Sequence, residues 1–318
     1  MFQHRLMPAP VLRLLPLVLV GTLSAGCVIT GAEGRYVERE EKRFSLEGKD
    51  GKDGKEGKDA RADVKLLTRD GAIEIRSWDR PEVLVVIEKH AFSKEAAAAM
   101  TVSSSQDGNH ISVDATLSRG ETLSGFFWGG LGSAKLIVSL PSTSDVQATT
   151  GDGSIDLEGV RGVIALRSGD GSIQAREAAG SVAARSGDGS IRFDRIKGAI
   201  DVNTGDGSIT VSGVFTGVRA RSGDGSVGVQ AQAGSTTETD WDIASGDGSI
   251  TLEVPESFGA EFDAHTGDGR VHFEGVTLSN VSGDLTRSRA NGRLGAGGHA
   301  MRVRTGDGSI FVKRVSAP

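Results

Sequence analysis

A seven-residue motif recurs in this chain at a fixed interval. The sequence Arg-Ser-Gly-Asp-Gly-Ser-Ile spans residues 167–173 and is repeated at 185–191. The first glycine of the Gly-Asp-Gly core stands at 151, 169, 187, 205 and 223, and returns after longer steps at 246, 267 and 306. A strict period of this length predicts structural repeats that stack on one another and share one continuous core.

Apolar residues occupy equivalent places in the aligned repeats, two positions apart. The fifth place holds Ile155, Ile173, Ile191, Ile209 and Val227, and the seventh holds Leu157, Ala175, Phe193, Val211 and Val229. This spacing predicts strands with one buried face, and the breaks in parity after the seventh and sixteenth places predict corners. We therefore expect an all-β fold, a single-stranded β-solenoid (β-helix) with coils of about 18 residues, in which Phe193 fills the space beside Ala175.

The repeated motif itself is interpreted as a corner of each coil. A sharp corner favours positive φ, which glycine adopts readily and aspartate tolerates, while flanking serine hydroxyls can bond to nearby backbone. A repeated ligand site is the alternative, and we favour the structural interpretation. The predicted corner aspartates are Asp152, Asp170, Asp188, Asp206, Asp224, Asp247, Asp268 and Asp307.

Stacked coils would place these aspartates at the spacing of adjacent strands, about 4.8 Å, where like charges repel. Arginine stands three residues before the aspartate at four corners, and we expect this arginine ladder to neutralise the acids. Calcium is the alternative, as in repeat toxins with Gly-Asp nonapeptides, although this chain departs from their nine-residue rule. We predict no metal and no cofactor. The arginines are Arg167, Arg185, Arg221 and Arg304.

The first 26 residues have the features of a secretory signal peptide. Arg5 and Arg13 precede a short apolar run at 14–20, and small residues lead to the single cysteine, Cys27. The segment resembles a bacterial lipobox, which implies cleavage before Cys27 and acylation of its thiol. By the same resemblance, Val28 favours the outer membrane if the cell has two. A chance cysteine in an ordinary signal is the alternative.

The rest of the chain divides by composition. Residues 27–60 are predicted to be a flexible tether because Gly, Lys, Asp and Glu make up almost all of 48–60. Residues 61–148 are predicted to be an N-terminal β region with degenerate coils and one short helix at 93–100, and 149–318 to be regular repeats. A glycine-rich loop at 125–132 carries Phe126, Phe127 and Trp128, which either fold over the core or form an exposed patch for a partner or lipid.

The sequence offers little that points to catalysis. A formal net charge of −6 provides no basic field for nucleic acid, and the six histidines lack metal-ligand spacing. The carboxylates recur with the repeat and do not converge, so we predict that the protein is not an enzyme. The outward sixth place runs Asp156, Gln174, Arg192, Thr210 and Gly228, which is not the threonine ladder of an ice-binding face.

Three segments and the corner motif resemble a known family. The segments are IEIRSWDRPEVLVVIEKH, LIVSLPSTSDVQATTGDGSI and LEVPESFGAEFDAHTGDGRV, and the corner is Ser/Thr-Gly-Asp-Gly after each strand. From Ala62 to Val315 the chain is similar to the bacterial putative-adhesin family of β-strand-repeat domains of unknown function. The resemblance implies an extracytoplasmic, right-handed β-solenoid without established enzymatic activity, and offers no catalytic residues to carry over.

These observations together predict a lipid-anchored β-solenoid of the cell envelope that acts as a non-catalytic binding, adhesion or scaffolding module. Its partners would be the membrane, through the N-terminal anchor, and an envelope protein or polysaccharide, with no nucleic acid. Two alternatives remain open at this point: an envelope polysaccharide-active enzyme built on a β-helix, and a sensory or regulatory envelope protein.

Overall fold

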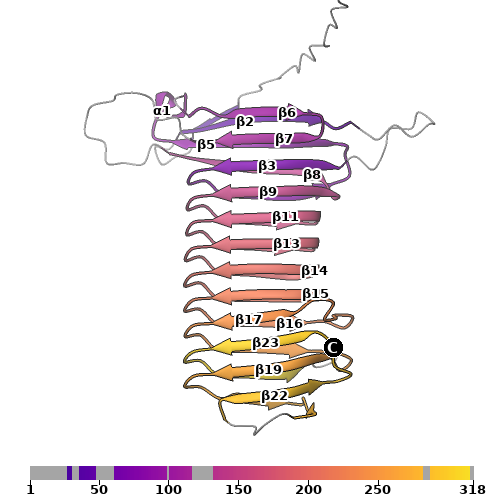
Figure 1. The fold of residues 1–318 in the computed structure, drawn as a ribbon. Coiled ribbons are helices and arrows are strands. Elements are labelled where there is room, and N and C mark those ends of the chain that lie inside the picture. The colour runs from indigo at the N-terminus through magenta and orange to yellow at the C-terminus, as the bar shows by residue number, and fades with distance from the viewer. Residues whose placement is uncertain are drawn as a thin grey trace, which may run out of the picture.

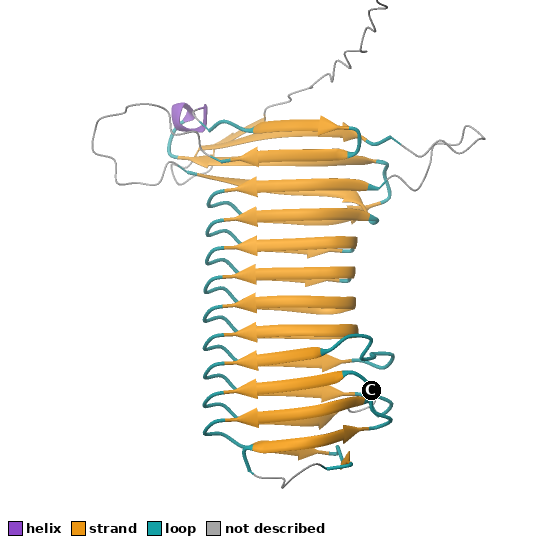
Figure 2. Ribbon diagram, viewed as in Figure 1, coloured by secondary structure: helices purple, strands orange, loops and turns teal. Residues whose placement is uncertain are grey.

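Twenty-four strands and one five-residue helix make up the described part of the chain, and the strands join into a single hydrogen-bonded sheet. The structure is a computed structural model, which describes residues 27–30, 36–47, 61–98, 100–116, 132–281 and 287–315. The strands stack into an elongated column (Figure 1), and short loops repeat along one of its edges (Figure 2). The expected all-β, solenoid-like fold is confirmed.

Face A of the column is a parallel ladder of ten strands, eight of which end at the Gly-Asp-Gly corners. Its spatial order starts at the N-terminal end of the column, and β14 and β15 contribute their second halves. The strands are β7 (His110–Ala115), β3 (Ala62–Thr68), β9 (Ser144–Thr150), β11 (Arg161–Ser168), β13 (Ala179–Ser186), β14 (Ile191–Thr204), β15 (Ile209–Ser222), β17 (Trp241–Ser245), β23 (Ala300–Thr305) and β19 (Ala260–Thr266).

Face B is the matching ladder on the other side of the core, and begins where each corner ends. The first halves of β14 and β15 belong to it. Its other strands are, in spatial order, β8 (Ser133–Pro141), β4 (Ile73–Trp78), β10 (Ile155–Glu158), β12 (Ile173–Arg176), β16 (Val227–Ala231), β18 (Ile250–Val254), β24 (Ile310–Arg314) and β20 (Val271–Glu274).

The apolar places of the repeat meet between the two faces in the predicted register. Ile173 of β12 pairs with Ile155 on one side and Ile191 on the other, an offset of one full sequence repeat each way. Phe193 is 1% exposed and pairs with Ala175, so its predicted burial is confirmed. The core is therefore one continuous column of side chains.

The register differs from the expected one in the coil that contains β15. Bulges in the pairing of β14 with β15 shift the partners, so that Val214 lies beside Lys197 instead of Ile196. Phe215 is fully buried in its place, and packs edge-to-face against Trp241 with ring centroids 6.1 Å apart. The coil of β15 has the regular length, with corner glycines at 205 and 223, whereas Trp241 belongs to the next coil, which is five residues longer because its corner glycines stand at 223 and 246.

The last coil of the chain does not stack last. The strand β23 pairs with both β17 and β19, and β24 pairs with both β18 and β20. The C-terminal coil is thus inserted between two coils that precede it in sequence. The repeats predicted within 149–318 therefore do not stack in sequence order at this end, where three corners with the same motif offer equivalent backbone for pairing.

The same interleaving occurs at the other end. The coil of β3 and β4 lies between β7 and β8 on one side and β9 and β10 on the other. Antiparallel strands then cover the ends of the column: β5 (Glu82–Ala91) pairs with β8, β6 (Ser103–Asp107) with β7, and β22 (Arg289–Leu294) with β19, followed by the short β21 (Leu278–Ser279). These strands give the terminal coils hydrogen-bond partners that an open stack would lack.

The expectation of a tether over residues 27–60 is wrong for part of that range. Residues Tyr36–Ser45 form β2, which pairs along its whole length with β5, and Cys27–Thr30 form β1, which pairs with β2. Lys89 of β5 is almost fully buried, with Glu38 at 3.6 Å and Glu40 at 3.7 Å. The charged composition of this segment did not predict a strand, since these charges are accommodated in the sheet by cross-strand ion pairs.

The only helix among the described residues, α1 (Lys94–Ala98), lies in the segment where the sequence indicates one. The Ser93 hydroxyl accepts a hydrogen bond from the Ala96 amide at 3.2 Å, as an N-cap residue does. No helix in the described ranges has the length and apolar character needed to cross a bilayer. The predicted signal peptide and the residues Phe126, Phe127 and Trp128 lie outside the described residues.

Candidate functional site

Each corner is held by a buried hydroxyl that precedes the Gly-Asp-Gly core. The Ser186 hydroxyl donates to the Gly171 carbonyl of the preceding coil at 2.9 Å and accepts a hydrogen bond from the Gly189 amide of its own corner at 3.1 Å. The same donor and acceptor geometry recurs with Ser168, and Thr204 donates in the same way. The hydroxyl joins two coils and satisfies buried backbone groups that would otherwise lack a partner.

The corner glycines are needed for a different reason from the one predicted. None of the described Gly-Asp-Gly glycines has a positive φ. A Cβ built at Gly171 would instead overlap the carbonyl oxygen of Gly153, and one built at Gly189 would overlap that of Gly171. Successive coils approach so closely at this edge that only glycine fits.

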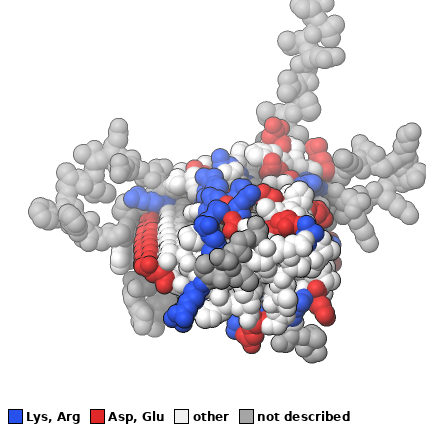
Figure 3. All heavy atoms as spheres, turned by 60° about the horizontal axis from the view of Figure 1, so that its bottom comes forward, with Lys and Arg blue, Asp and Glu red and all other residues white. Residues whose placement is uncertain are grey.

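The corner aspartates form a column along this edge, which we call the Asp edge. All eight predicted aspartates are exposed, and Figure 3 shows the column as a continuous red line on the surface. No ion pair from an arginine to any of the eight is found among the described residues. The predicted arginine ladder is therefore wrong as a neutralising device.

Three of the four arginines pair with aspartates of face A instead. Arg221 contacts Asp242, Arg304 lies 3.4 Å from Asp263, and Arg185 lies 4.0 Å from Asp201. Each arginine precedes the buried corner hydroxyl and points outward from its strand, whereas the corner aspartate lies beyond the turn. Within the described ranges, no group of three or more histidine, cysteine or acidic side chains is arranged to hold a metal ion.

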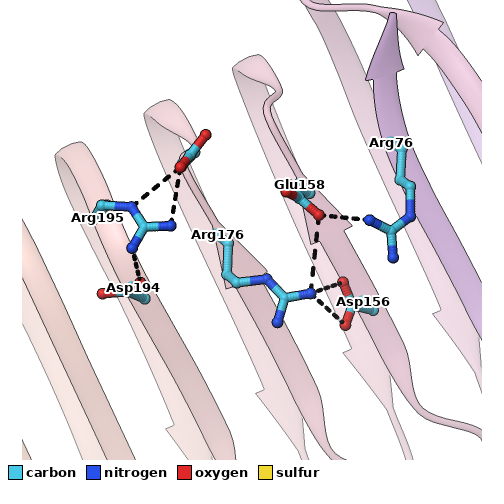
Figure 4. A network of polar contacts seen from close by, with 7 residues as sticks. Arg76, Asp156, Glu158, Arg176, Asp194 and Arg195 are labelled. Carbon is cyan, nitrogen blue, oxygen red and sulfur yellow. Dashed lines mark hydrogen bonds and ion pairs between the residues drawn. The ribbon is translucent and has the colours of Figure 1, made fainter.

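The opposite edge of the column, which we call the paired edge, alternates in charge from coil to coil. Arg176 lies 3.2 Å from Asp156 and 3.9 Å from Glu158, and Glu158 also lies 2.7 Å from Arg76 (Figure 4). One coil further on, Arg195 lies 2.7 Å from its neighbour Asp194 (Figure 4). Carboxylates and guanidinium groups of successive coils therefore neutralise one another along this edge.

The turn at the paired edge also differs in backbone conformation. Gly159, Glu177 and Arg195 occupy equivalent turn positions in three successive repeats, with φ of 79°, 53° and 53°. Glu177 and Arg195 thus adopt a left-handed conformation that costs a non-glycine residue about 1 kcal/mol or more. Their side chains form an ion pair at 2.9 Å, which ties the two turns together.

An acidic residue near the paired edge has a lowered pKa. Asp145 of β9 is partly desolvated, which by itself would raise its pKa. Hydrogen bonds from the Arg61 guanidinium at 2.5 and 2.9 Å and from the Val163 amide at 2.7 Å outweigh that effect and lower the pKa of the carboxyl group. Asp145 therefore connects the first coil in the sequence to two later ones.

Two adjoining hollows lie on face B toward the C-terminal end. The first has a volume of about 180 Å³ and is lined by Thr210, Val211, Ser212, Gly228, Val229, Gln230, Thr251 and Glu253. The second has a volume of about 450 Å³ and is lined by Gln230, Glu253, Glu274, Gly275, Lys313, Arg314 and Val315. Because Gln230 and Glu253 belong to both, the hollows form one groove across the coils, which we call the face B groove.

A family model described as Toastrack DUF4097 matches residues 63–313 of this repeat-built fold. The chain belongs to the Toastrack DUF4097 family. The resemblance to a family of unknown function, inferred from the corner motif, is confirmed. No curated protein matches the chain.

Solved structures show distant similarity to this Toastrack chain. A putative adhesin from Parabacteroides merdae is 10% identical, with 87% of this chain and 96% of that one covered and a TM-score of 0.41. A putative lipid binding protein from Parabacteroides distasonis is 10% identical, with 87% and 97% covered and a TM-score of 0.38. A putative cell adhesion protein from Clostridium sporogenes is 11% identical, with 87% and 99% covered and a TM-score of 0.30. No functional argument follows from similarities at this level.

The face B groove was not predicted from the Toastrack sequence. The interruption of the outward sixth place at Gly228 indicates, in the sequence, only that no threonine ladder is present. In the structure, Gly228 lies between Thr210 and Thr251 on neighbouring strands. Since Thr251 follows an irregular repeat, its place in the column becomes visible only from the strand pairing.

Proposed function

We propose that this protein is a lipid-anchored, non-catalytic binding or scaffolding module of the cell envelope, and that its regular part is a right-handed β-solenoid with 18-residue coils. The register offset of one sequence repeat between neighbouring strands supports the coil length. The proposed anchor is Cys27, the first residue of β1, which pairs with β2 in the sheet, so the anchor would hold the N-terminal end of the column at the bilayer.

The observation that carries the proposal is that outward polar side chains continue from coil to coil along the column, with an identical residue at each corner of the Asp edge. The Asp edge, the paired edge and the face B groove each extend over several coils. An extended partner such as a polymer chain can contact such a surface at many equivalent points, and weak contacts then add up to useful affinity. A protein that binds in this way needs no convergent catalytic centre.

Binding is tested with the Cys27→Ser chain and isolated envelope fragments, so that a lipid anchor cannot cause the association. We expect the chain to sediment with the fragments in a saturable manner, with serum albumin remaining in solution. A chain that stays in the supernatant at every fragment concentration would contradict a binding role.

The anchor is tested by partitioning between detergent and water. The unmodified chain made in its bacterial host is expected to enter the detergent phase, because acyl chains hold a protein stably in a bilayer. The Cys27→Ser chain is expected in the aqueous phase. Equal recovery of both chains in detergent would show that Cys27 carries no anchor.

A further inference from the structure

In the first hollow of the face B groove, one position is kept open by a glycine that the fold does not require. In neighbouring strands Gly228 pairs with Thr210 and with Thr251. Adjacent strands are about 4.8 Å apart, so the two threonines stand about 9.6 Å apart on either side of a position without a side chain. The result is a slot one strand wide between two hydroxyl-bearing walls.

Gly228 differs from every other described glycine. Each of the others either has a φ in the left-handed region or would bring a Cβ into close contact with a neighbouring atom. At Gly228 the φ is ordinary, and the nearest atom to a Cβ would be the Ile209 carbonyl oxygen at 3.8 Å. Glycine inside a strand is destabilising relative to alanine. A glycine that neither the backbone conformation nor the packing requires therefore indicates that the open space itself is needed.

The groups around the slot can bond to hydroxyls as donors and as acceptors. The Gln230 amide donates to the Glu253 carboxylate at 2.9 Å, which orients both side chains along one wall. The remaining carboxylate lone pairs, the amide oxygen and the threonine hydroxyls are available to a ligand. No lysine or arginine lines this hollow, so nothing in the slot selects for an anion.

We propose that the slot over Gly228 binds one pyranose ring of a saccharide chain. A pyranose presents a face of C–H groups and a rim of hydroxyls, each of which donates and accepts. In the proposed complex the C–H face would lie toward the open position over Gly228, and the polar walls would bond to the rim hydroxyls. This inference rests on the proposed binding function and gives it a ligand class.

The second hollow extends the site beyond one ring. It shares Gln230 and Glu253 with the slot and reaches Lys313, which lies 3.4 Å from Glu274. The Phe311 and His272 rings stack beside it on face B with centroids 5.0 Å apart and planes 9° apart. In the proposed site, a second sugar ring would continue into this hollow and lie beside the Lys313–Glu274 ion pair.

The test is calorimetric titration of the full chain in detergent micelles with oligosaccharides of two to six rings, made of glucose, N-acetylglucosamine or galacturonate. We expect at least one series to bind the unmodified chain. Gly228→Thr fills the slot with the residue found on both sides, and should weaken binding at least tenfold without lowering the melting temperature. Gln174→Thr, in the same outward column but outside the groove, is the matched control and should bind unchanged.

Two results would overturn the inference: no binding of any series to the unmodified chain, or equal binding by Gly228→Thr. The envelope sedimentation experiment separates this failure from a failure of the proposed function. If Cys27→Ser and Cys27→Ser/Gly228→Thr chains sediment equally with envelope fragments, the protein binds the envelope through another surface and the saccharide slot is wrong.

Discussion

The two edges of the column are built from the same repeat, but different contacts hold the stacked coils together at each edge. At the Asp edge, eight coils have the same Gly-Asp-Gly turn, buried hydroxyls link the coils, and no ion pair to an arginine is found for the eight acids of the described corners. At the paired edge, the turn residues vary, φ is left-handed, and charges of opposite sign alternate from coil to coil. Backbone also approaches backbone next to the paired edge, where a Cβ at Gly180 or Gly198 would overlap a carbonyl oxygen of the preceding coil, but there the neighbouring turn residues vary and side-chain ion pairs add to the contacts.

The difference shows that sequence repetition has different causes at the two edges. At the Asp edge, overlap with the neighbouring carbonyl leaves no residue other than glycine, and the buried serine or threonine is needed to satisfy the backbone. The column of like charges is a cost of this arrangement, because neighbours about 4.8 Å apart in water repel by about 0.9 kcal/mol before salt screening. At the paired edge, neighbouring charges of opposite sign form ion pairs, so no such repulsion between coils arises there.

A substitution in the core between the edges should have the largest effect on the free energy of unfolding. Phe193→Ala should lower the free energy of unfolding by about 3–5 kcal/mol, because a fully buried ring beside Ala175 is removed and the rigid coils cannot close the space. Urea titration measures the change. A loss below about 1 kcal/mol would mean that both edges, and not the core, hold the coils together.

The steric claim about the Asp edge is tested by one substitution at two glycines. Gly171→Ala should cost about 3 kcal/mol or more, since its Cβ would overlap the Gly153 carbonyl. Gly228→Ala, on the open face, should instead stabilise the chain by about 0.5–1 kcal/mol. Similar effects at the two positions, measured by chemical denaturation, would remove the distinction between required and free glycines.

Loss of one corner hydroxyl should cost less than a steric clash. Ser186→Ala leaves the Gly171 carbonyl and the Gly189 amide without their partner, and should destabilise by about 1–2 kcal/mol. Ser190→Ala, at an exposed position of the same corner, should remain within about 0.5 kcal/mol of the unmodified chain. If the two variants melt at the same temperature, the hydrogen bonds of the corner hydroxyl are not what holds the coils together at this edge.

The contribution of the Asp145 carboxylate, near the paired edge, to the free energy of unfolding should disappear in acid. The pKa of Asp145 is lowered in the folded chain, so its contribution to stability is complete above the unfolded value of about 3.8 and disappears as pH falls through the folded value. Asp145→Asn should therefore cost about 1 kcal/mol at pH 7, and this difference should shrink to zero in acid. A cost independent of pH would show that the carboxylate charge plays no part.

Much of the coil could be predicted from the sequence, because apolar residues at every second place determine which side of a strand is buried. The fifth and seventh places, including Ile173 and Phe193, needed no further information. The order of the coils at the ends could not be predicted, since the corners at 246, 267 and 306 carry the same motif and pair equally well with one another. Strand β2 was missed because its charged composition indicated a tether, whereas backbone pairing with β5, the buried Phe44 and ion pairs to Lys89 hold it in the sheet.

The surfaces were harder to predict than the core. Arg185 and Asp188 are close in sequence, yet the buried Ser186 and the turn separate them, so spacing alone gave the wrong ion pair. The slot at Gly228 depends on Thr251, which reaches its neighbouring position only after an insertion of five residues in the preceding coil. A surface built from several coils is defined by pairing between strands, which the sequence determines only where the repeat is regular.

The most direct test of the contrast between the edges is the salt dependence of two charge-removing variants, Asp188→Asn at the Asp edge and Glu177→Gln at the paired edge. Free energies of unfolding are measured at ionic strengths of about 0.01 M and 1 M, where the screening length is about 30 Å and 3 Å. At low salt, Asp188→Asn should stabilise by about 1 kcal/mol and Glu177→Gln should destabilise by about 0.5 kcal/mol, and both differences should shrink at high salt. Destabilisation by Asp188→Asn at low salt would contradict the account, because it would show that the aspartate column is held by attraction, as a bridging cation would provide.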